Sequence, residues 1–390
     1  MTAAIEVEAA AAAILPILEE ASPEAERNRS VAPEAIRAIQ EAGLSRLMTP
    51  KRFGGAEAPA SAHIQSCITL AHGCAAAAWV HMVCGAHTYV VGRFPEACQR
   101  DVFDASPDVL IPGALAPQGK AHRVDGGWRL SGRWQFGSGI DHGPWLLLGA
   151  VARQTSEGDP MGLNLVLPKA RVEVLDTWRT LGMRGSGSQD IVAEDVFVPD
   201  SHAMPTLELF RGNFAVEAGQ DMGALYRLPV MGGLATMLAG VLVGMTERGL
   251  ERFTEAARTR IEVYSGRPKS GRVGLQMRLA EALGEAQLAR MLVERNCELL
   301  DAAMLADDPP LSVDASAQIR WNAAHASEIC RRAADRAYAA AGANAAFDDN
   351  PLQQWRRDIE TATHHAICDF DGALEMRGRV ALGLSPGAML

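Results

Sequence analysis

Apolar residues recur at helical spacing in both end regions of the chain. Near the N-terminus, Ile36 and Ile39 share one face of a segment that Pro33 can open and Gly43 can close, because Pro is favoured at the first helical position and Gly just beyond the last. After residue 222 the helical spacing continues almost to the C-terminus. This half of the chain therefore predicts an antiparallel bundle of long helices with short loops. The helices are expected around 225–262, 273–306, 311–342 and 352–380.

Strand-like alternation is confined to the middle of the chain. Residues 112–200 contain 14 of the 37 glycines, and such a density of turn residues indicates many short connections. Within this block, Asp125-Gly126-Gly127 has the composition of a hairpin turn. The hairpin is expected over 122–134, with further strands at 145–151, around 172–174 and around 196–198. The predicted units are an N-terminal helical domain (1–110), a central β-domain (111–210) and a C-terminal helical bundle (211–390).

The composition is that of a globular protein and excludes several classes of partner. Of the 390 residues, 48% are hydrophobic and 22% are charged, and 37 Lys+Arg against 47 Asp+Glu leave a net charge of −10. Without a basic run, a nucleic-acid partner is not expected. No uninterrupted apolar stretch approaches the length of a membrane span, so no membrane contact is expected either.

Targeting and cysteine signals predict a cytoplasmic protein. The first residues include Glu6 and Glu8 and lack the basic region of a signal peptide. The seven cysteines are odd in number and contain no C-x-x-C pair. We therefore expect reduced, mostly buried thiols, and no metal site.

Four short segments in order along the chain carry a further signal. They are PEAI…EAGL…PKRFGG within 33–55, GGWRLSGRWQFGSG at 126–139, DTW…LGMRGSGS…DVFVP within 176–199, and PLQQWRRD at 351–358 followed by His365. Together they resemble the acyl-CoA dehydrogenase superfamily. The resemblance implies a mainly α fold with a central β-domain: N-terminal helices, a middle β-barrel or sandwich, and a C-terminal four-helix bundle.

Within that superfamily, the details are similar to the flavin-dependent monooxygenases of two-component systems. The segments GRW-x-F-x-SG and TW…GMRG-x-GS, and the stretch from Trp79 through His87 to Pro95, resemble those of phenol, hydroxyphenylacetate, hydroxylated-steroid and dibenzothiophene oxygenases. This resemblance implies an oxygenase component that uses reduced FMN, with FAD also possible, and O2. A C4a-hydroperoxyflavin would then oxygenate an aromatic or heteroaromatic small molecule.

The same resemblance implies two kinds of protein partner. A separate NAD(P)H-dependent flavin reductase would supply the reduced flavin, and the chain has neither a P-loop nor a Rossmann glycine fingerprint of its own. A homotetramer is expected, as in the relatives.

The sequence lacks the carboxylate that serves as the base in the acyl-CoA dehydrogenase reaction. That reaction requires a carboxylate to remove an α-proton, placed in the family either shortly after the C-terminal Arg-Asp or on the first bundle helix. Here the first place reads Thr363-His364-His365-Ala366, and no acid lies between Asp221 and Glu247. An acyl-CoA dehydrogenase or oxidase with FAD and an atypical base is the alternative. A non-catalytic member of the fold is a third possibility.

Three residues are the catalytic candidates by resemblance: His365, Ser138 and His87. His365 would deprotonate or orient the substrate, since a histidine titrates near neutral pH. Ser138 would hydrogen-bond the flavin edge, and His87 would lie on the substrate side. The alternatives are a helix-face histidine paired with an acid for His365, turn geometry for Ser138, and a core histidine for His87.

Flavin contacts are expected from two regions. The first comprises Trp134, Phe136, Ser138, Trp178, Arg184, Ser186 and Ser188. The second region is a cluster of cations, and the resemblance implies that one of them reaches a flavin phosphate across a subunit interface: Arg258, Arg260, Arg267, Lys269 or Arg272. The alternatives are core tryptophans for Trp134 and Trp178, and a solvated turn for the cations.

Overall fold

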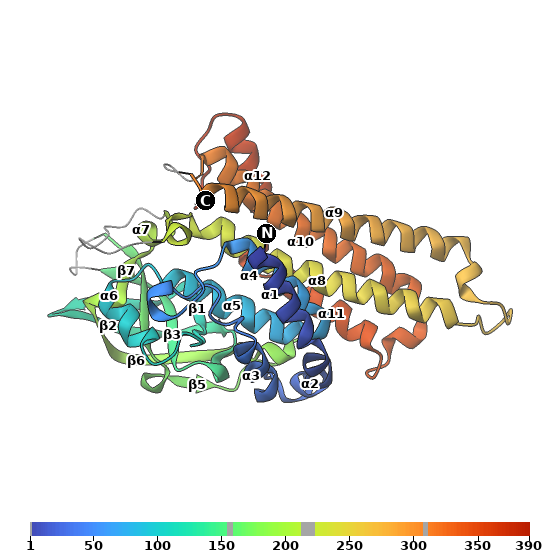
Figure 1. Ribbon diagram of the computed structural model, residues 1–390, viewed down its shortest axis with the longest axis horizontal. Coiled ribbons are helices and arrows are strands. Elements are labelled where there is room, and N and C mark those ends of the chain that lie inside the picture. The colour runs from blue at the N-terminus through green and yellow to red at the C-terminus, as the bar shows by residue number, and fades with distance from the viewer. Residues whose placement is uncertain (1, 154–158, 212–222, 307–310) are drawn as a thin grey trace.

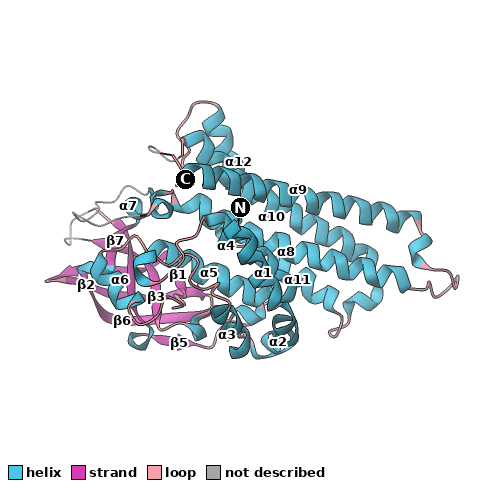
Figure 2. Cartoon of the chain, in the orientation of Figure 1, coloured by secondary structure: helices cyan, strands magenta, loops and turns pink. Residues whose placement is uncertain are grey.

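A computed structural model describes residues 2–153, 159–211, 223–306 and 311–390 of the chain. N-terminal helices, a β-sheet and long C-terminal helices follow one another, which confirms the mainly helical fold with a central β-domain (Figures 1 and 2). The N-terminal helices are α1 (Thr2–Ala13), α2 (Leu15–Asn28), α3 (Pro33–Glu41), α4 (Ala60–Gly73), α5 (Ala75–Val91) and α6 (Glu96–Phe103). As predicted, Pro33 begins a helix whose Ile36 and Ile39 are buried.

The β-domain is one seven-stranded sheet. Its strands are β1 (Gly113–Val124), β2 (Gly127–Gly137), β3 (Trp145–Arg153), β4 (Met161–Pro168), β5 (Glu173–Leu175), β6 (Gln189–Pro199) and β7 (Ala203–Pro205), in the order β5-β6-β2-β1-β3-β4-β7. β1 and β3 are parallel, and the other neighbours are antiparallel. The predicted hairpin is confirmed, with Gly126 at φ 71° in the turn between β1 and β2.

The C-terminal part is built on three long helices that run side by side (Figure 1). These are α8 (Val230–Thr259), α9 (Val273–Met304) and α10 (Val313–Ala341), close to the predicted ranges; the short α7 (Thr206–Arg211) precedes them. The predicted fourth helix over 352–380 is wrong, because the chain forms α11 (Pro351–Thr363) and α12 (Phe370–Ala381) with a break between them. The break contains His364 and His365, and it places them outside any α-helix.

The helix α8 is the core of the molecule. It packs against α4, α5, α9 and α10, and Gly244 lets α4 approach so closely that a Cβ there would lie 2.1 Å from the Ile68 carbonyl oxygen. By length and composition α8 could cross a membrane, contrary to the expectation from the sequence, but 89% of its most apolar window is buried inside the protein. All seven cysteines are buried and unpaired, as predicted.

Candidate active site

A chain of polar contacts joins three segments that are distant in the sequence. The indole Nε1 of Trp79, on α5, donates to Ser138 Oγ at 3.1 Å. Ser138, directly after β2, lies 2.7 Å from Ser188 Oγ, which lies 2.8 Å from Ser186 Oγ. The Gly139 N–H also donates to the Ser186 carbonyl at 3.0 Å. The structure thus brings together Ser138, Ser186 and Ser188, which the sequence assigned to flavin binding, and adds Trp79.

His365 joins this group from the C-terminal side. Its ring centroid lies 5.9 Å from that of Trp79, in an edge-on arrangement. The break between α11 and α12 orients the imidazole, because Nδ1 accepts a hydrogen bond from the Ile367 N–H at 3.2 Å. A neutral imidazole that accepts at Nδ1 carries its proton on Nε2. His365 therefore presents an N–H donor.

Desolvation, together with the Arg320 guanidinium, lowers the pKa of His365 to about 4. The side chain nevertheless keeps exposed surface. The lowered pKa favours the neutral imidazole in the ligand-free protein, and the role of His365 in the reaction stays a prediction.

His87, on α5, has the opposite hydrogen-bonding polarity. It is 5% exposed, and its Nδ1 lies 2.8 Å from the Ile111 carbonyl oxygen. Since a carbonyl only accepts, Nδ1 carries the proton and Nε2 is left as an acceptor. Burial lowers the pKa of His87 to about 4, and the nearby His365 contributes in the same direction. The two imidazoles thus have opposite hydrogen-bonding roles, His365 as a donor and His87 as an acceptor.

Buried neutral histidines make the fold sensitive to acid, which is a first testable prediction. His63 and His87 each have a pKa of about 4, against 6.5 when unfolded, and that of His81 is also lowered. Between pH 6.5 and 4 the unfolded chain binds more protons, so stability falls as the pH falls, by up to about 1.4 kcal/mol per pH unit for each buried histidine. Asp358, with a pKa of about 7, and Asp301, whose pKa is also raised by burial, act in the opposite direction, as two groups against these three histidines.

Thermal unfolding followed by circular dichroism at pH 7, 6 and 5 checks this prediction, with the melting temperature expected to drop at each step. A melting temperature that stays constant or rises over this range would contradict it.

Two aromatic residues face the exterior beside the serines. Phe136 is 61% exposed and adopts φ 65°, and its ring lies 6.0 Å from Trp178 in an edge-on arrangement. The Trp178 indole Nε1 donates to the Met183 carbonyl at 3.0 Å. These aromatic surfaces, with the serine hydroxyls, have the chemical character that an isoalloxazine ring requires.

Trp134 is placed elsewhere, in the core of the sheet. It has no exposed surface, and its Nε1 donates to the Gly149 carbonyl at 2.6 Å. A Cβ at Gly119 would lie 2.1 Å from its ring. The structure therefore contradicts a flavin contact for Trp134 in this conformation and assigns it to packing between β1, β2 and β3.

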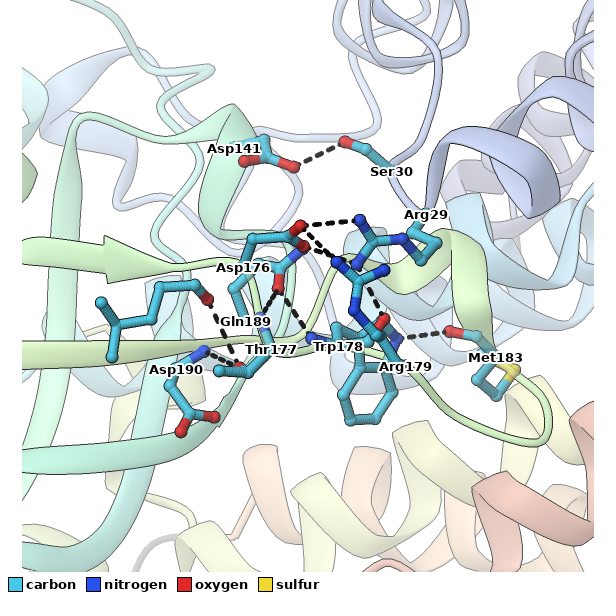
Figure 3. A network of polar contacts seen from close by, with 11 residues as sticks. Arg29, Ser30, Asp141, Asp176, Thr177, Trp178, Arg179, Met183, Gln189 and Asp190 are labelled. Carbon is cyan, nitrogen blue, oxygen red and sulfur yellow. Dashed lines mark hydrogen bonds and ion pairs between the residues drawn. The ribbon is translucent and has the colours of Figure 1, made fainter.

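The loop between β5 and β6 carries Trp178, Arg184, Ser186 and Ser188, and polar contacts hold it at both ends. Gln189 Oε1 accepts from the N–H groups of Thr177 and Trp178, each at 2.9 Å. Arg29, after α2, pairs with Asp176 at 2.5 Å and donates to the Trp178 carbonyl at 3.1 Å (Figure 3). The sequence reasoning missed Arg29 and Gln189, since nothing local marks residues that act across 147 and 11 positions.

Arg184 lies on this loop with an exposed side chain. Its Nε donates to the Thr180 carbonyl at 2.9 Å, and Nη1 lies 3.6 Å from Glu26. The cation is therefore present at the loop surface, as expected for a residue that meets a phosphate.

Arg258 and Arg260 lie far from this group within one chain. They occupy the end of α8 that points away from the sheet (Figure 1). Arg260 approaches Gly342, where a Cβ would lie 3.0 Å from Nη2. A role for either arginine at the site would require a second subunit.

One buried group among the described residues has metal-ligand chemistry. His63, Cys67 and His81 place their ligand atoms within 4.8 Å of one another. However, Ser66 already engages His81 Nε2 at 2.8 Å. The two imidazole centroids are 4.4 Å apart, closer than the roughly 5 Å expected for two rings on one tetrahedral ion. The geometry is that of packed core histidines.

The chain is similar to known proteins along most of its length. Two family models match, "Acyl-CoA dehydrogenase, N-terminal domain" over residues 7–103 and "Acyl-CoA dehydrogenase, C-terminal domain" over residues 236–370. The p-hydroxyphenylacetate 3-hydroxylase oxygenase component of Acinetobacter baumannii is 30% identical over 96% of this chain and 88% of its own.

Two further relatives are named together with a flavin. The FADH(2)-dependent resorcinol hydroxylase oxygenase component of Rhizobium sp. is 27% identical over 96% of this chain and 93% of its own. The structure of XiaF from Streptomyces sp. in complex with FADH2 and glycerol superposes with a TM-score of 0.92 at 28% identity, covering 99% of this chain and 97% of that one.

Proposed function

The chain belongs to the acyl-CoA dehydrogenase superfamily and, within it, to the oxygenase components of flavin-dependent monooxygenases; from this premise we propose that it hydroxylates a phenol-type aromatic substrate. The family resemblance of the sequence motifs is thereby confirmed. The observation that carries the proposal is the His365 imidazole, an N–H donor, edge-on to Trp79, which itself donates to Ser138. His87, on the same helix as Trp79, adds an acceptor at Nε2.

The residues present fit a flavin. The hydroxyl contacts can run in one direction, from Ser186 to Ser188 to Ser138, while Trp79 donates to the same Ser138 oxygen. In this arrangement the Ser138 hydroxyl hydrogen is left free to donate to a ligand. Ser138 would thus meet the flavin edge, Phe136 and Trp178 its ring, and Arg184 an anionic part. When bound, the reduced flavin supplies the electrons that activate O2 for transfer of one oxygen atom to the substrate.

The two histidines divide the proton chemistry between them. His87 Nε2 accepts the proton of the substrate hydroxyl, which raises the electron density of the aromatic ring at the carbons ortho and para to that hydroxyl. His365 Nε2–H donates a hydrogen bond to an oxygen atom that gains negative charge during transfer. Both nitrogens act in the neutral form, which the lowered pKa values maintain at pH 7.

The reaction of an acyl-CoA dehydrogenase receives no support from this site. Among the described residues, no carboxylate contributes to the pKa shift of His365, and the charged group that does is Arg320. No carboxylate beside His365 is therefore available for the α-proton removal that the dehydrogenases of this family carry out with such a base.

A direct assay tests the proposed function. The protein is supplied with FMN or FAD, a flavin reductase, NADH and a panel of phenols under 18O2, and products are identified by mass spectrometry. We expect a hydroxylated product carrying one 18O atom. Formation of hydrogen peroxide alone across the panel, although reduced flavin binds, would contradict the proposal.

The proposed function includes FMN as the flavin and a separate reductase that supplies it in reduced form. The preference for FMN stays a prediction, and FADH2 is the flavin named for two of the relatives. A separate reductase is proposed because related proteins are named as oxygenase components. Seven buried thiols support a reducing, cytoplasmic location.

Self-association is proposed from an apolar face of α9. Val273, Met277, Leu288 and Met291 recur on one side of this helix and are 54–66% exposed. A groove of about 520 Å³ between α8 and α9 adjoins this face and includes Leu250, Leu283 and Arg258. Exposed apolar surface of this kind marks an interface between subunits. We propose a homotetramer, and light scattering during size-exclusion chromatography measures whether the mass is four times 41.6 kDa.

A further inference from the structure

We propose that Asp358 is a positioning residue that couples the order of the flavin-binding loop, residues 176–188, to pH. The inference rests on the proposed function for the identity of the ligand, whereas the contact between Asp358 and the loop is independent of it. Neither the sequence motifs nor the relatives' names assign this role.

The helix α11 holds the loop backbone directly. Asp358 Oδ1 accepts a hydrogen bond from the Met183 N–H at 2.5 Å. The preceding residue, Arg357, donates to the Leu181 carbonyl, and a Cβ at Gly182 would lie 2.1 Å from the Arg357 carbonyl oxygen. Two adjacent residues of α11 therefore contact three consecutive residues of the loop.

Met183 is the centre of this contact. Its N–H is bound by Asp358, and its carbonyl accepts from the Trp178 indole at 3.0 Å. The residue adopts φ 53°, a conformation that costs free energy for a side chain other than glycine. Such a conformation persists only where surrounding contacts hold it, so the Asp358 hydrogen bond maintains the conformation of the loop that carries Trp178 and Arg184.

The Asp358 carboxyl is buried and its ionisation is close to balance. It is 5% exposed, and burial raises its pKa to about 7. This net value includes the Glu26 carboxylate on α2, which raises the pKa, and the Met183 N–H, Arg357 and Gln354, which lower it. Arg184 and Cys74 also face Asp358, around a cavity of about 10 Å³ that can hold one water molecule.

The charges around Asp358 are themselves paired. Glu26 accepts from Arg357 at 2.9 Å and lies 3.6 Å from Arg184. The neighbouring cations are therefore shared with Glu26 rather than reserved for Asp358, which is consistent with a carboxyl that is not fully ionised at pH 7.

Ionisation of Asp358 and docking of the loop against α11 stabilise each other. The Met183 N–H stabilises the carboxylate, so by linkage the carboxylate stabilises the docked loop. A hydrogen bond to an ionised acceptor is roughly twice as strong as a neutral one. We therefore expect flavin to bind about fivefold more tightly at pH 8 than at pH 6, on this account alone.

The test compares the full-length protein with Asp358→Asn. The amide oxygen of Asn still accepts from the Met183 N–H but does not titrate between pH 6 and 8. Dissociation constants for FMN and FAD are measured by fluorescence at pH 6, 7 and 8. The wild type is expected to gain about fivefold in affinity relative to the variant over this range; the flavin's own titration is common to both proteins and cancels in the ratio.

A second readout needs no flavin. Hydrogen exchange of peptides covering residues 176–188 is compared between the two proteins at each pH, and the wild type should gain protection relative to Asp358→Asn as the pH rises. If Asp358→Asn does not fold, Glu26→Gln replaces it. Removing that neighbouring carboxylate should move the midpoint of the pH dependence to lower pH.

The outcomes separate the two proposals. Identical pH profiles for the wild type and the variants in both readouts would overturn the role of Asp358. The wild type could instead gain protection of residues 176–188 relative to the variant as the pH rises, while none of the proteins binds flavin at any pH. This result would support the contact between Asp358 and the loop and would overturn the proposed function.

Discussion

Replacing His87 by Asn is expected to lower the hydroxylation rate by a hundredfold or more, while the protein still consumes reduced flavin and O2. The amide nitrogen of Asn can keep the hydrogen bond from Nδ1 to the Ile111 carbonyl, so the local structure is retained. What is lost is the acceptor at Nε2, which in the proposed reaction takes the proton of the substrate hydroxyl. Reducing equivalents should then appear as hydrogen peroxide, and the ratio of product to NADH consumed measures the loss.

The effect of His87→Asn should depend on whether the phenol is already ionised at the assay pH. A phenol that is already ionised at the assay pH does not need a proton acceptor, so His87→Asn should affect it much less than an un-ionised phenol. An equal loss for both kinds of phenol would contradict the assignment of His87 as the acceptor and would favour a purely structural role in α5.

Replacing His365 by Ala is expected to reduce kcat by about a hundredfold, because a donor aimed at developing negative charge typically contributes this much. The variant His365→Gln is the informative comparison. Its amide can place an N–H near the position of Nε2, and we expect activity within about tenfold of the wild type. Single-turnover kinetics with pre-reduced flavin separate the oxygen-transfer step from flavin binding.

The neighbouring His364 is the matched control for this experiment. It is exposed, and its Nε2 lies 3.4 Å from Glu360 rather than toward Trp79. The change His364→Ala should leave kcat unchanged within about twofold. Equal losses in His364→Ala and His365→Ala, or no rescue by Gln, would show that the segment matters only for folding.

Much of the fold could be predicted because its signals are local. The spacing of apolar residues predicts α8, α9 and α10 to within a few residues, and the Asp125-Gly126 turn predicts the β1–β2 hairpin. The fourth bundle helix could not be predicted correctly. No proline or glycine interrupts residues 359–368, and the break there depends on distant partners, such as Ser327 beside Cys368 at 3.3 Å.

The candidate site, too, could be predicted only in part, because some of its features depend on residues distant in the sequence. Residue types and motif order indicate Ser138, Ser188, His87 and His365, and the structure brings Ser138, Ser188 and His365 together around Trp79, with His87 on the same helix as Trp79. Trp134 looks equivalent to Trp178 in the sequence, yet it is buried in the sheet. The pattern of β2 cannot decide which of its aromatic residues faces inward and which faces a ligand, because bulges shift its register against β6 between Leu130 and Gly132 and between Trp134 and Gly137.

The amino-acid sequence by itself determined the family, the order of helical and β regions, and the chemical identity of the groups available for catalysis. These depend on residue type and on spacing over a few turns or strands. Only the tertiary structure decided which tautomers His87 and His365 adopt and that Asp358 is buried against Met183. Tautomers and pKa values follow from hydrogen bonds and desolvation by residues up to 175 positions away, and such distances leave no mark on the local pattern of a chain.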